Sequence, residues 1–212
     1  MITENHITVQ KTARFYTLGE LNQNTKHVWM VIHGFRQSAQ SFLTEFQPLA
    51  NDSTFFIAPE ALNRFYIDKQ GTEVGATWMT REDRVNEIKD YINYLDTLYL
   101  NLGLNNYKGN ITALGFSQGA STVTRWLNAT QNRVDRAIVY GGEVAPELLP
   151  LSETSGLRKT YNYFICGKRD KFITAERLSM AQEAYKALNF TEIFFEGGHE
   201  INTASLKSLI AQ

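Results

Sequence analysis

Short apolar runs rich in β-branched and aromatic residues alternate with longer segments of helical length along this chain. The apolar runs are His27–His33, Thr54–Ala58, Asn110–Gly115, Ala137–Tyr140, Tyr161–Cys166 and Glu192–Phe195. The segments that predict helices are Ser38–Ala50, Arg81–Leu102, Gly119–Asn128, Ala175–Leu188 and Thr203–Ile210. Several runs are continuously apolar, which is typical of strands covered on both faces. The alternation therefore predicts a doubly wound α/β fold, a mostly parallel sheet with helices on both faces.

The chain shows no internal repeat and no linker-like stretch, so we predict a single domain over residues 1–212. Ile7–Leu18 is predicted to form a strand or hairpin at an edge of the sheet. Thr80, with Asp83 three residues later, is predicted to cap the long helix. Residues 60–80 follow a strand and are predicted to form an irregular insertion near the functional site. In such sheets ligands bind beyond the carboxyl ends of the strands, so functional residues are expected there.

Charge and composition disfavour several classes of function. The 212 residues include 21 Lys and Arg against 22 Asp and Glu, a net charge of −1, so nucleic acid is not an expected partner. Mean hydropathy is −0.31, and no apolar run approaches the roughly 18 residues that a membrane span needs. Cys166 is the single cysteine and cannot form an internal disulfide. The N-terminal residues lack the apolar core of a signal peptide, so a cytoplasmic location is expected.

No metal site and no cofactor are expected. The histidines are scattered along the chain without the spacing of metal ligands. The glycine pair Gly141-Gly142 lacks the companions of a nucleotide-binding motif. The oligomeric state is left open by the sequence.

A candidate nucleophile lies in the motif Gly115-Phe116-Ser117-Gln118-Gly119. This G-x-S-x-G pattern follows a predicted strand and precedes a predicted helix, which is the context in which it indicates a catalytic serine. The sharp turn exposes the hydroxyl beyond the sheet, at a helix N-terminus that favours developing negative charge. Ser117 is therefore the predicted nucleophile.

Ser117 needs a general base, and His199 is the predicted one. It follows the last predicted strand in Gly197-Gly198-His199 and precedes the last helix. A carboxylate must in turn orient the imidazole. Asp170 follows the penultimate strand and completes the order Ser…Asp…His, which favours it. Glu143, after the preceding strand, remains the competing acid.

The predicted oxyanion hole consists of two backbone N–H groups, those of Phe35 and Gln118. Gln118 follows the nucleophile, and Phe35 lies in the His33-Gly34-Phe35 loop after the first strong strand. His33 is interpreted as a residue that shapes this loop through a backbone hydrogen bond, rather than as a base.

Four apolar residues of the insertion, Phe65, Tyr66, Trp78 and Met79, have two open interpretations. They either wall a substrate pocket or cover the sheet, because concave sites and cores share this composition. We name Tyr66, Trp78 and Met79 as the candidate pocket residues.

The chain resembles the α/β-hydrolases, and most resembles the small phospholipase/carboxylesterase group that includes acyl-protein thioesterases. The shared residues lie between residues 28 and 200 and are His33-Gly34, Ala58-Pro59, Gly115 to Ala120, Gly167 with Asp170 and Ile173, and Gly198-His199. The resemblance implies Ser117, Asp170 and His199 as a triad, with the oxyanion donors named above. The glycine-aspartate pair that follows His-Gly in the thioesterases is replaced here by Phe35-Arg36-Gln37.

The expected function is that of a serine hydrolase acting on carboxylic esters of small or medium acyl groups through an acyl-enzyme. The expected partner is a small-molecule ester. Two alternatives stay open: a thioesterase or lysophospholipase-like activity on the same triad, and a non-catalytic member of the fold that binds a ligand.

Overall fold

A mostly parallel sheet forms the centre of the structure, a computed structural model that describes residues 1–210. Seven strands lie in the order β1-β3-β2-β6-β7-β8-β9, and only β1 is antiparallel to its neighbour. The strands are β1 (Phe15–Leu18), β2 (His27–Ile32), β3 (Thr54–Pro59), β6 (Asn110–Phe116), β7 (Arg136–Tyr140), β8 (Tyr161–Gly167) and β9 (Thr191–Phe195). The helices are α1 (Ala39–Thr44), α2 (Arg84–Asn101), α3 (Gln118–Ala129), α4 (Ala175–Ala187) and α5 (Thr203–Ile210). The predicted fold class is confirmed.

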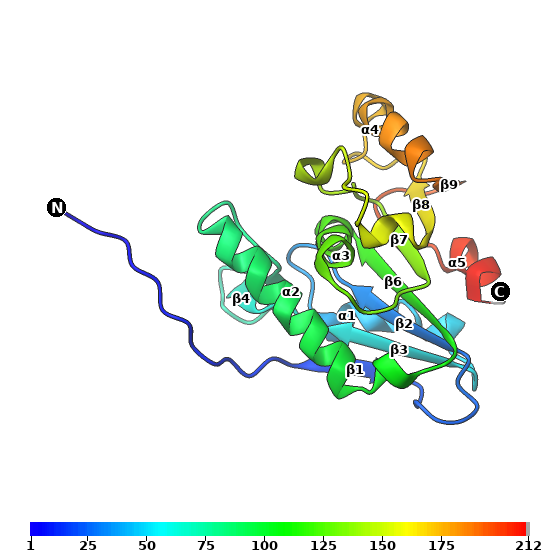
Figure 1. Cartoon of the computed structure of the whole chain (residues 1–212), viewed down its shortest axis with the longest axis horizontal. Helices are drawn as coiled ribbons and strands as arrows, with labels where there is room; N and C mark the ends of the chain where they lie inside the picture. Colours follow the sequence, from blue (N-terminus) through cyan, green and yellow to red (C-terminus); the bar gives the residue numbers. More distant parts are fainter. Residues whose placement is uncertain (211–212) are drawn as a thin grey trace.

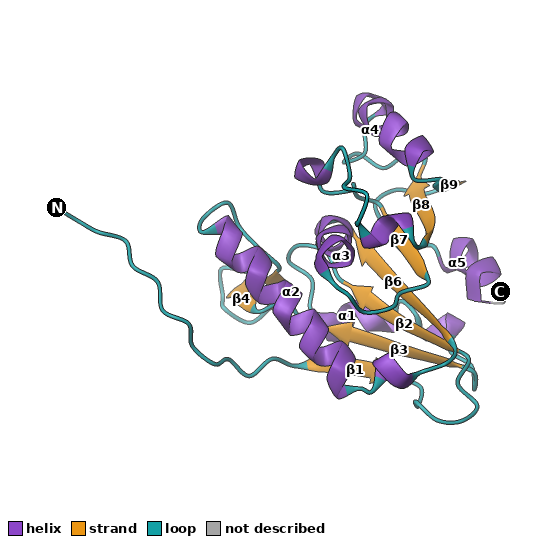
Figure 2. Ribbon diagram, in the orientation of Figure 1, coloured by secondary structure: helices purple, strands orange, loops and turns teal. Residues whose placement is uncertain are grey.

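Helices cover both faces of the sheet (Figure 2). Successive side chains of a strand point to opposite faces. Val28, Met30 and Ile32 of β2 therefore pack with α2 and α3, whereas Trp29 and Val31 pack with α1 and α5. Both sets are fully buried, which explains why β2 appears in the sequence as a continuous apolar run.

The N-terminal prediction is correct in place but too long. β1 pairs with β3 at the edge of the sheet, as expected, but it comprises only Phe15–Leu18 and forms no hairpin. Residues 1–14 form neither helix nor strand, and they extend away from the sheet (Figure 1).

Two predicted helices are shorter than expected. The helix predicted over Ser38–Ala50 ends at Thr44, and a separate 3-10 turn follows over Gln47–Leu49 with Pro48 inside it. Proline lacks the N–H that a continuing α-helix needs, so it favours the interruption. The prediction that Thr80 caps the long helix is wrong. α2 begins at Arg84, and the residue before it, Asp83, has φ of 44° and makes no side-chain cap bond.

The insertion over residues 60–80 is not irregular. It contains a two-stranded antiparallel hairpin, β4 (Asn63–Tyr66) and β5 (Val74–Thr77), separate from the main sheet. Ala76 of β5 exchanges backbone hydrogen bonds with the loop after β2: Arg36 N donates to Ala76 O, and Ala76 N donates to Gln37 O, both at 3.0 Å. The hairpin therefore fixes the loop that holds Phe35.

Across residues 1–210, none of the helices has the length and apolar character to cross a membrane.

Candidate active site

Ser117 lies in a sharp turn between β6 and α3. Its φ of 55° and ψ of −117° lie outside the regions that residues with a side chain normally occupy. The glycines on either side permit this turn. A Cβ at Gly115 would lie 2.1 Å from Gly119 O, and one at Gly119 would lie 2.2 Å from Ile32 O. The G-x-S-x-G spacing thus reflects backbone crowding on both sides of the serine.

His199 and Asp170 form a hydrogen-bonded pair. His199 Nδ1–H donates to Asp170 Oδ2 at 2.7 Å, and the Asp170 side chain is only 1% exposed. Asp170 Oδ1 accepts a second bond, from Phe172 N at 2.8 Å. Because Nδ1 carries the proton toward the carboxylate, Nε2 of the neutral ring retains its lone pair. The imidazole therefore has the tautomer that a general base needs.

Aromatic packing holds the His199 ring in place. The rings of Phe116 and Phe172 each have their centroids 4.7 Å from that of His199. Phe116 directly precedes the nucleophile, so this contact connects the Ser117 turn to the imidazole. The loop after His199 is anchored as well, because Asn202 N donates to the buried Tyr140 hydroxyl at 2.7 Å.

Gly141 and Gly142, at the end of β7, place the serine turn beside the His–Asp pair. A Cβ at Gly141 would lie 3.4 Å from both Asp170 Oδ2 and His199 Cε1, and one at Gly142 would lie 2.5 Å from Ser117 O. No hydrogen bond joins Ser117 Oγ to His199 within residues 1–210. Hydrogen bonds of this kind often form fully only when substrate is bound.

Glu143, the competing acid, does not contact His199. Its Oε1 lies 3.3 Å from Arg177 Nη1, in an ion pair. Lys168, a possible ion-pair partner of Asp170, instead contacts Glu196. The described contacts of the imidazole therefore favour Asp170.

The N–H groups of Phe35 and Gln118 are both unpaired within residues 1–210. Gln118 is the first residue of α3, where backbone N–H groups have no partner in the helix. The loop that carries Phe35 passes beside the nucleophile, because a Cβ at Gly34 would lie 3.1 Å from Ser117 Cβ. Gln37 Oε1 stabilises this loop by accepting a bond from Gly34 N at 2.7 Å. Two free donors thus lie on the two segments that the sequence predicted.

His33 is fully buried, and both of its ring nitrogens are hydrogen-bonded. Nε2 accepts from Ala61 N at 3.1 Å, so the proton is on Nδ1, which donates to Gly34 O at 2.7 Å. Burial lowers the pKa of His33 to about 4. A neutral ring with no free nitrogen shapes the loop and is unable to act as the base.

His33 makes folding stability dependent on pH. Because its pKa is about 4 in the folded chain and 6.5 unperturbed, the unfolded chain binds more protons between these values. Stability is therefore expected to fall as the pH drops from 6.5 to 4, by up to about 3 kcal/mol from this group. Urea unfolding at several pH values measures the slope. His33→Gln, which does not titrate, should show a shallower dependence, and parallel profiles would contradict the assignment.

An open cleft of about 270 Å³ adjoins the serine. It is lined by Ser117, Gln118, Ser121, Gly141, Gly142, Glu143, Phe172, Ile173 and Arg177. Its apolar wall comes from the β8–α4 loop, directly after Asp170. Phe172 and Ile173, two and three residues after the acid, are the apolar pair in the sequence that indicates this wall.

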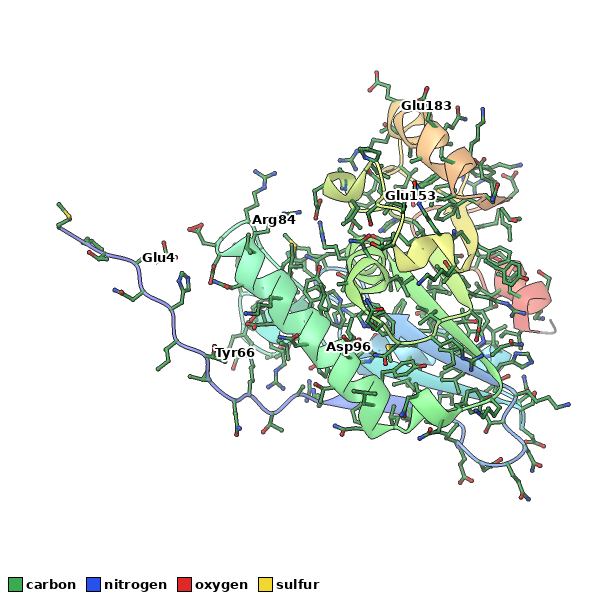
Figure 3. The ribbon with its side chains drawn as sticks, viewed as in Figure 1. Glu4, Tyr66, Arg84, Asp96, Glu153 and Glu183 are labelled. Atoms are coloured by element: carbon green, nitrogen blue, oxygen red, sulfur yellow. The ribbon has the colours of Figure 1, made fainter. Side chains whose placement is uncertain are left out.

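None of the three predicted pocket residues lines this cleft, so that prediction is wrong. Trp78 is buried in the core against Tyr91, and its Nε1 donates to His33 O at 2.9 Å. Met79 packs against the same core. Tyr66 is 67% exposed on the hairpin, far from α4 with its labelled Glu183 (Figure 3). Phe65 stacks on Phe35 at 5.6 Å and likewise lies outside the cleft lining.

Gln118 has a second role that its position in the motif did not reveal. Its side-chain Oε1 accepts from Trp78 N at 3.1 Å, and its Nε2 donates to Met79 O at 2.9 Å. The residue after the nucleophile therefore connects α3 to the end of the hairpin.

One exposed group of possible metal ligands is present, although none was expected. His6 Nε2 lies 3.2 Å from Glu4 Oε1 and 3.3 Å from Asp83 Oδ2. None of these residues belongs to the site around Ser117, and exposed groups of this kind are common without an ion.

The strand order, the strained serine turn and the histidine loop after the last strand define an α/β-hydrolase fold. The model of the phospholipase/carboxylesterase family matches residues 20–211. The chain belongs to this family of hydrolases.

Solved structures of esterases and thioesterases share the fold. Esterase PE8 superposes with a TM-score of 0.69 at 18% identity, over 94% of this chain and 96% of that one. Acyl-protein thioesterase 2 of Zea mays gives 0.68 at 14% identity, over 94% and 97%. The carboxylesterase of Bacillus cereus gives 0.67 at 14% identity, over 94% and 92%. A comparison with curated protein sequences gives no match.

Proposed function

We propose that this hydrolase cleaves carboxylic esters of small or medium acyl groups, with Ser117 as nucleophile, His199 as base and Asp170 as the orienting acid. The observation that carries the proposal is the 2.7 Å bond between His199 and the buried Asp170. A second observation supports it: the strained turn of Ser117 lies beside two backbone N–H groups that are unpaired within residues 1–210. A ligand-binding protein without catalysis has no need of this combination.

The first half of the proposed reaction forms an acyl-enzyme. His199 Nε2 takes the proton of Ser117 Oγ as this oxygen attacks the ester carbonyl carbon. The carbonyl oxygen becomes negatively charged and accepts hydrogen bonds from Phe35 N–H and Gln118 N–H, each worth about 3 kcal/mol in the transition state. His199 then gives the proton to the leaving alkoxide, and the alcohol departs.

The second half regenerates the enzyme. Water attacks the acyl carbon while His199 takes its proton. The bond between the acyl carbon and Ser117 Oγ then breaks, the acid departs, and His199 returns the proton to Ser117 Oγ. Asp170 stabilises the imidazolium in both halves without itself becoming protonated.

Labelling with a fluorophosphonate tests the nucleophile, because this reagent reacts with activated serines. An adduct on Ser117 in the folded protein, lost on denaturation, supports the proposal. An unlabelled folded protein that hydrolyses no p-nitrophenyl ester contradicts it and favours a ligand-binding role. Parallel kinetics on matched oxygen esters, thioesters and anilides then define which acyl bond is preferred. A marked preference for thioesters would change the proposed function from ester hydrolysis to thioester hydrolysis.

A further inference from the structure

The lining of the cleft beside Ser117 includes an ion pair as well as apolar side chains. Glu143 follows β7 and Arg177 lies in the first turn of α4, and their side chains meet at 3.3 Å with exposed fractions of 30% and 58%. Both residues line the cleft, together with the apolar side chains of Phe172 and Ile173. The lining of the cleft therefore combines apolar and charged side chains.

The backbone around this ion pair is held in place by further bonds. Ser121 Oγ donates to Glu143 O at 3.1 Å, which fixes the β7 loop against α3. Arg177 Nη1 also donates to Phe172 O at 3.1 Å, which fixes the wall of the cleft to α4. The ion pair thus connects two walls of the cleft.

The length of the apolar part follows from the geometry of α3. Ser117 and Ser121 both line the cleft and are four residues apart. At about 1.5 Å per residue, this spacing corresponds to about 6 Å between the nucleophile, which is the N-cap of α3, and Ser121, which bonds to Glu143 O. With C–C bonds of about 1.5 Å, a straight alkyl chain advances about 1.3 Å per carbon, so about four to five carbons fit.

We infer that the Glu143–Arg177 ion pair limits the length of the ester arm that the cleft accepts, so that short arms are the preferred substrates. This inference rests on the proposed function. Each methylene that leaves water for an apolar wall raises affinity about fourfold. A methylene that reaches the ion pair instead displaces water from charged groups. Because this displacement costs free energy, the methylene no longer raises affinity.

The experiment measures kcat/KM along two series of substrates, because either side of the ester can occupy the cleft. One series is p-nitrophenyl esters from acetate to dodecanoate, and the other is n-alkyl acetates followed by titration of released acid. In the series whose variable arm occupies the cleft, kcat/KM should rise about fourfold per carbon to about five carbons and then level or fall.

The double variant Glu143→Gln/Arg177→Met removes both charges. It should extend the rise by at least two carbons, which increases the ratio of eight-carbon to two-carbon kcat/KM about tenfold or more. Arg177→Lys keeps the charge and should keep the wild-type limit. Arg169→Met is the matched control, since Arg169 is an exposed arginine in the loop before α4 that pairs with Glu196 and does not line the cleft.

Two results would overturn the inference while leaving the proposed function intact. One is wild-type kcat/KM that keeps rising to dodecanoate or to long alkyl acetates in both series. The other is a limit that the double variant does not move although a small fluorophosphonate still labels it. If the double variant is not labelled, the inference is tested by the chain-length dependence of kcat/KM in the wild type and in Arg177→Lys. Absence of hydrolysis and of labelling in the wild type would instead contradict the proposed function.

Discussion

Ser117→Ala is expected to lower kcat for ester hydrolysis by about 10⁴-fold or more and to abolish fluorophosphonate labelling. Water is then the only nucleophile available, and the His199–Asp170 pair has no hydroxyl to activate. Alanine occupies the same backbone conformation, so the fold should remain. Initial rates on p-nitrophenyl butyrate and mass spectrometry of the labelled protein measure the two effects.

The matched control is Ser179→Ala, which removes the hydroxyl of an exposed serine on α4. It should keep both turnover and labelling. Thermal unfolding of the two variants should show similar midpoints. Ester turnover that survives Ser117→Ala at the wild-type rate would end the serine mechanism.

Asp170→Asn is expected to have the second large effect, a loss of about 10⁴-fold in kcat. An amide presents an N–H where the carboxylate accepts the His199 Nδ1 proton. The ring is then favoured in the opposite tautomer, with the proton on the nitrogen that should accept it from Ser117. Turnover of short esters, measured together with labelling of Ser117, reports this change.

Glu143→Gln separates the two candidate acids. Because Glu143 contacts Arg177 and not His199, its loss should cost far less than that of Asp170 on short esters. If Glu143→Gln abolishes turnover while Asp170→Asn leaves turnover unchanged, the roles assigned to the two acids are reversed.

The strands were predictable because each carries its own signal. Parallel strands covered on both faces need apolar side chains at nearly every position, and β2 and β3 show this directly in the sequence. The hairpin β4–β5 lacks such a signal, since half-buried and exposed residues alternate over only four positions in β4. Its partners outside the hairpin, Arg36 and Gln37, are distant in the sequence. The single domain and the cytoplasmic location stay predictions.

The wrong pocket prediction has a similar cause. Trp78 and Phe172 are both large and apolar, and the local sequence does not indicate which of the two packs into the core. Trp78 is buried because its indole reaches His33 O, whereas Phe172 stays 63% exposed beside His199. Burial depends on contacts between segments far apart in the chain.

The sequence alone determined the parallel α/β fold and the turn that presents Ser117, because periodicity and glycine spacing act over a few neighbouring residues. Tertiary structure alone decided which acid meets His199, which residues line the cleft, and that Glu143 pairs with Arg177 in that lining. These are contacts between loops that follow different strands. Such loops meet only when the sheet brings the carboxyl ends of its strands to one edge.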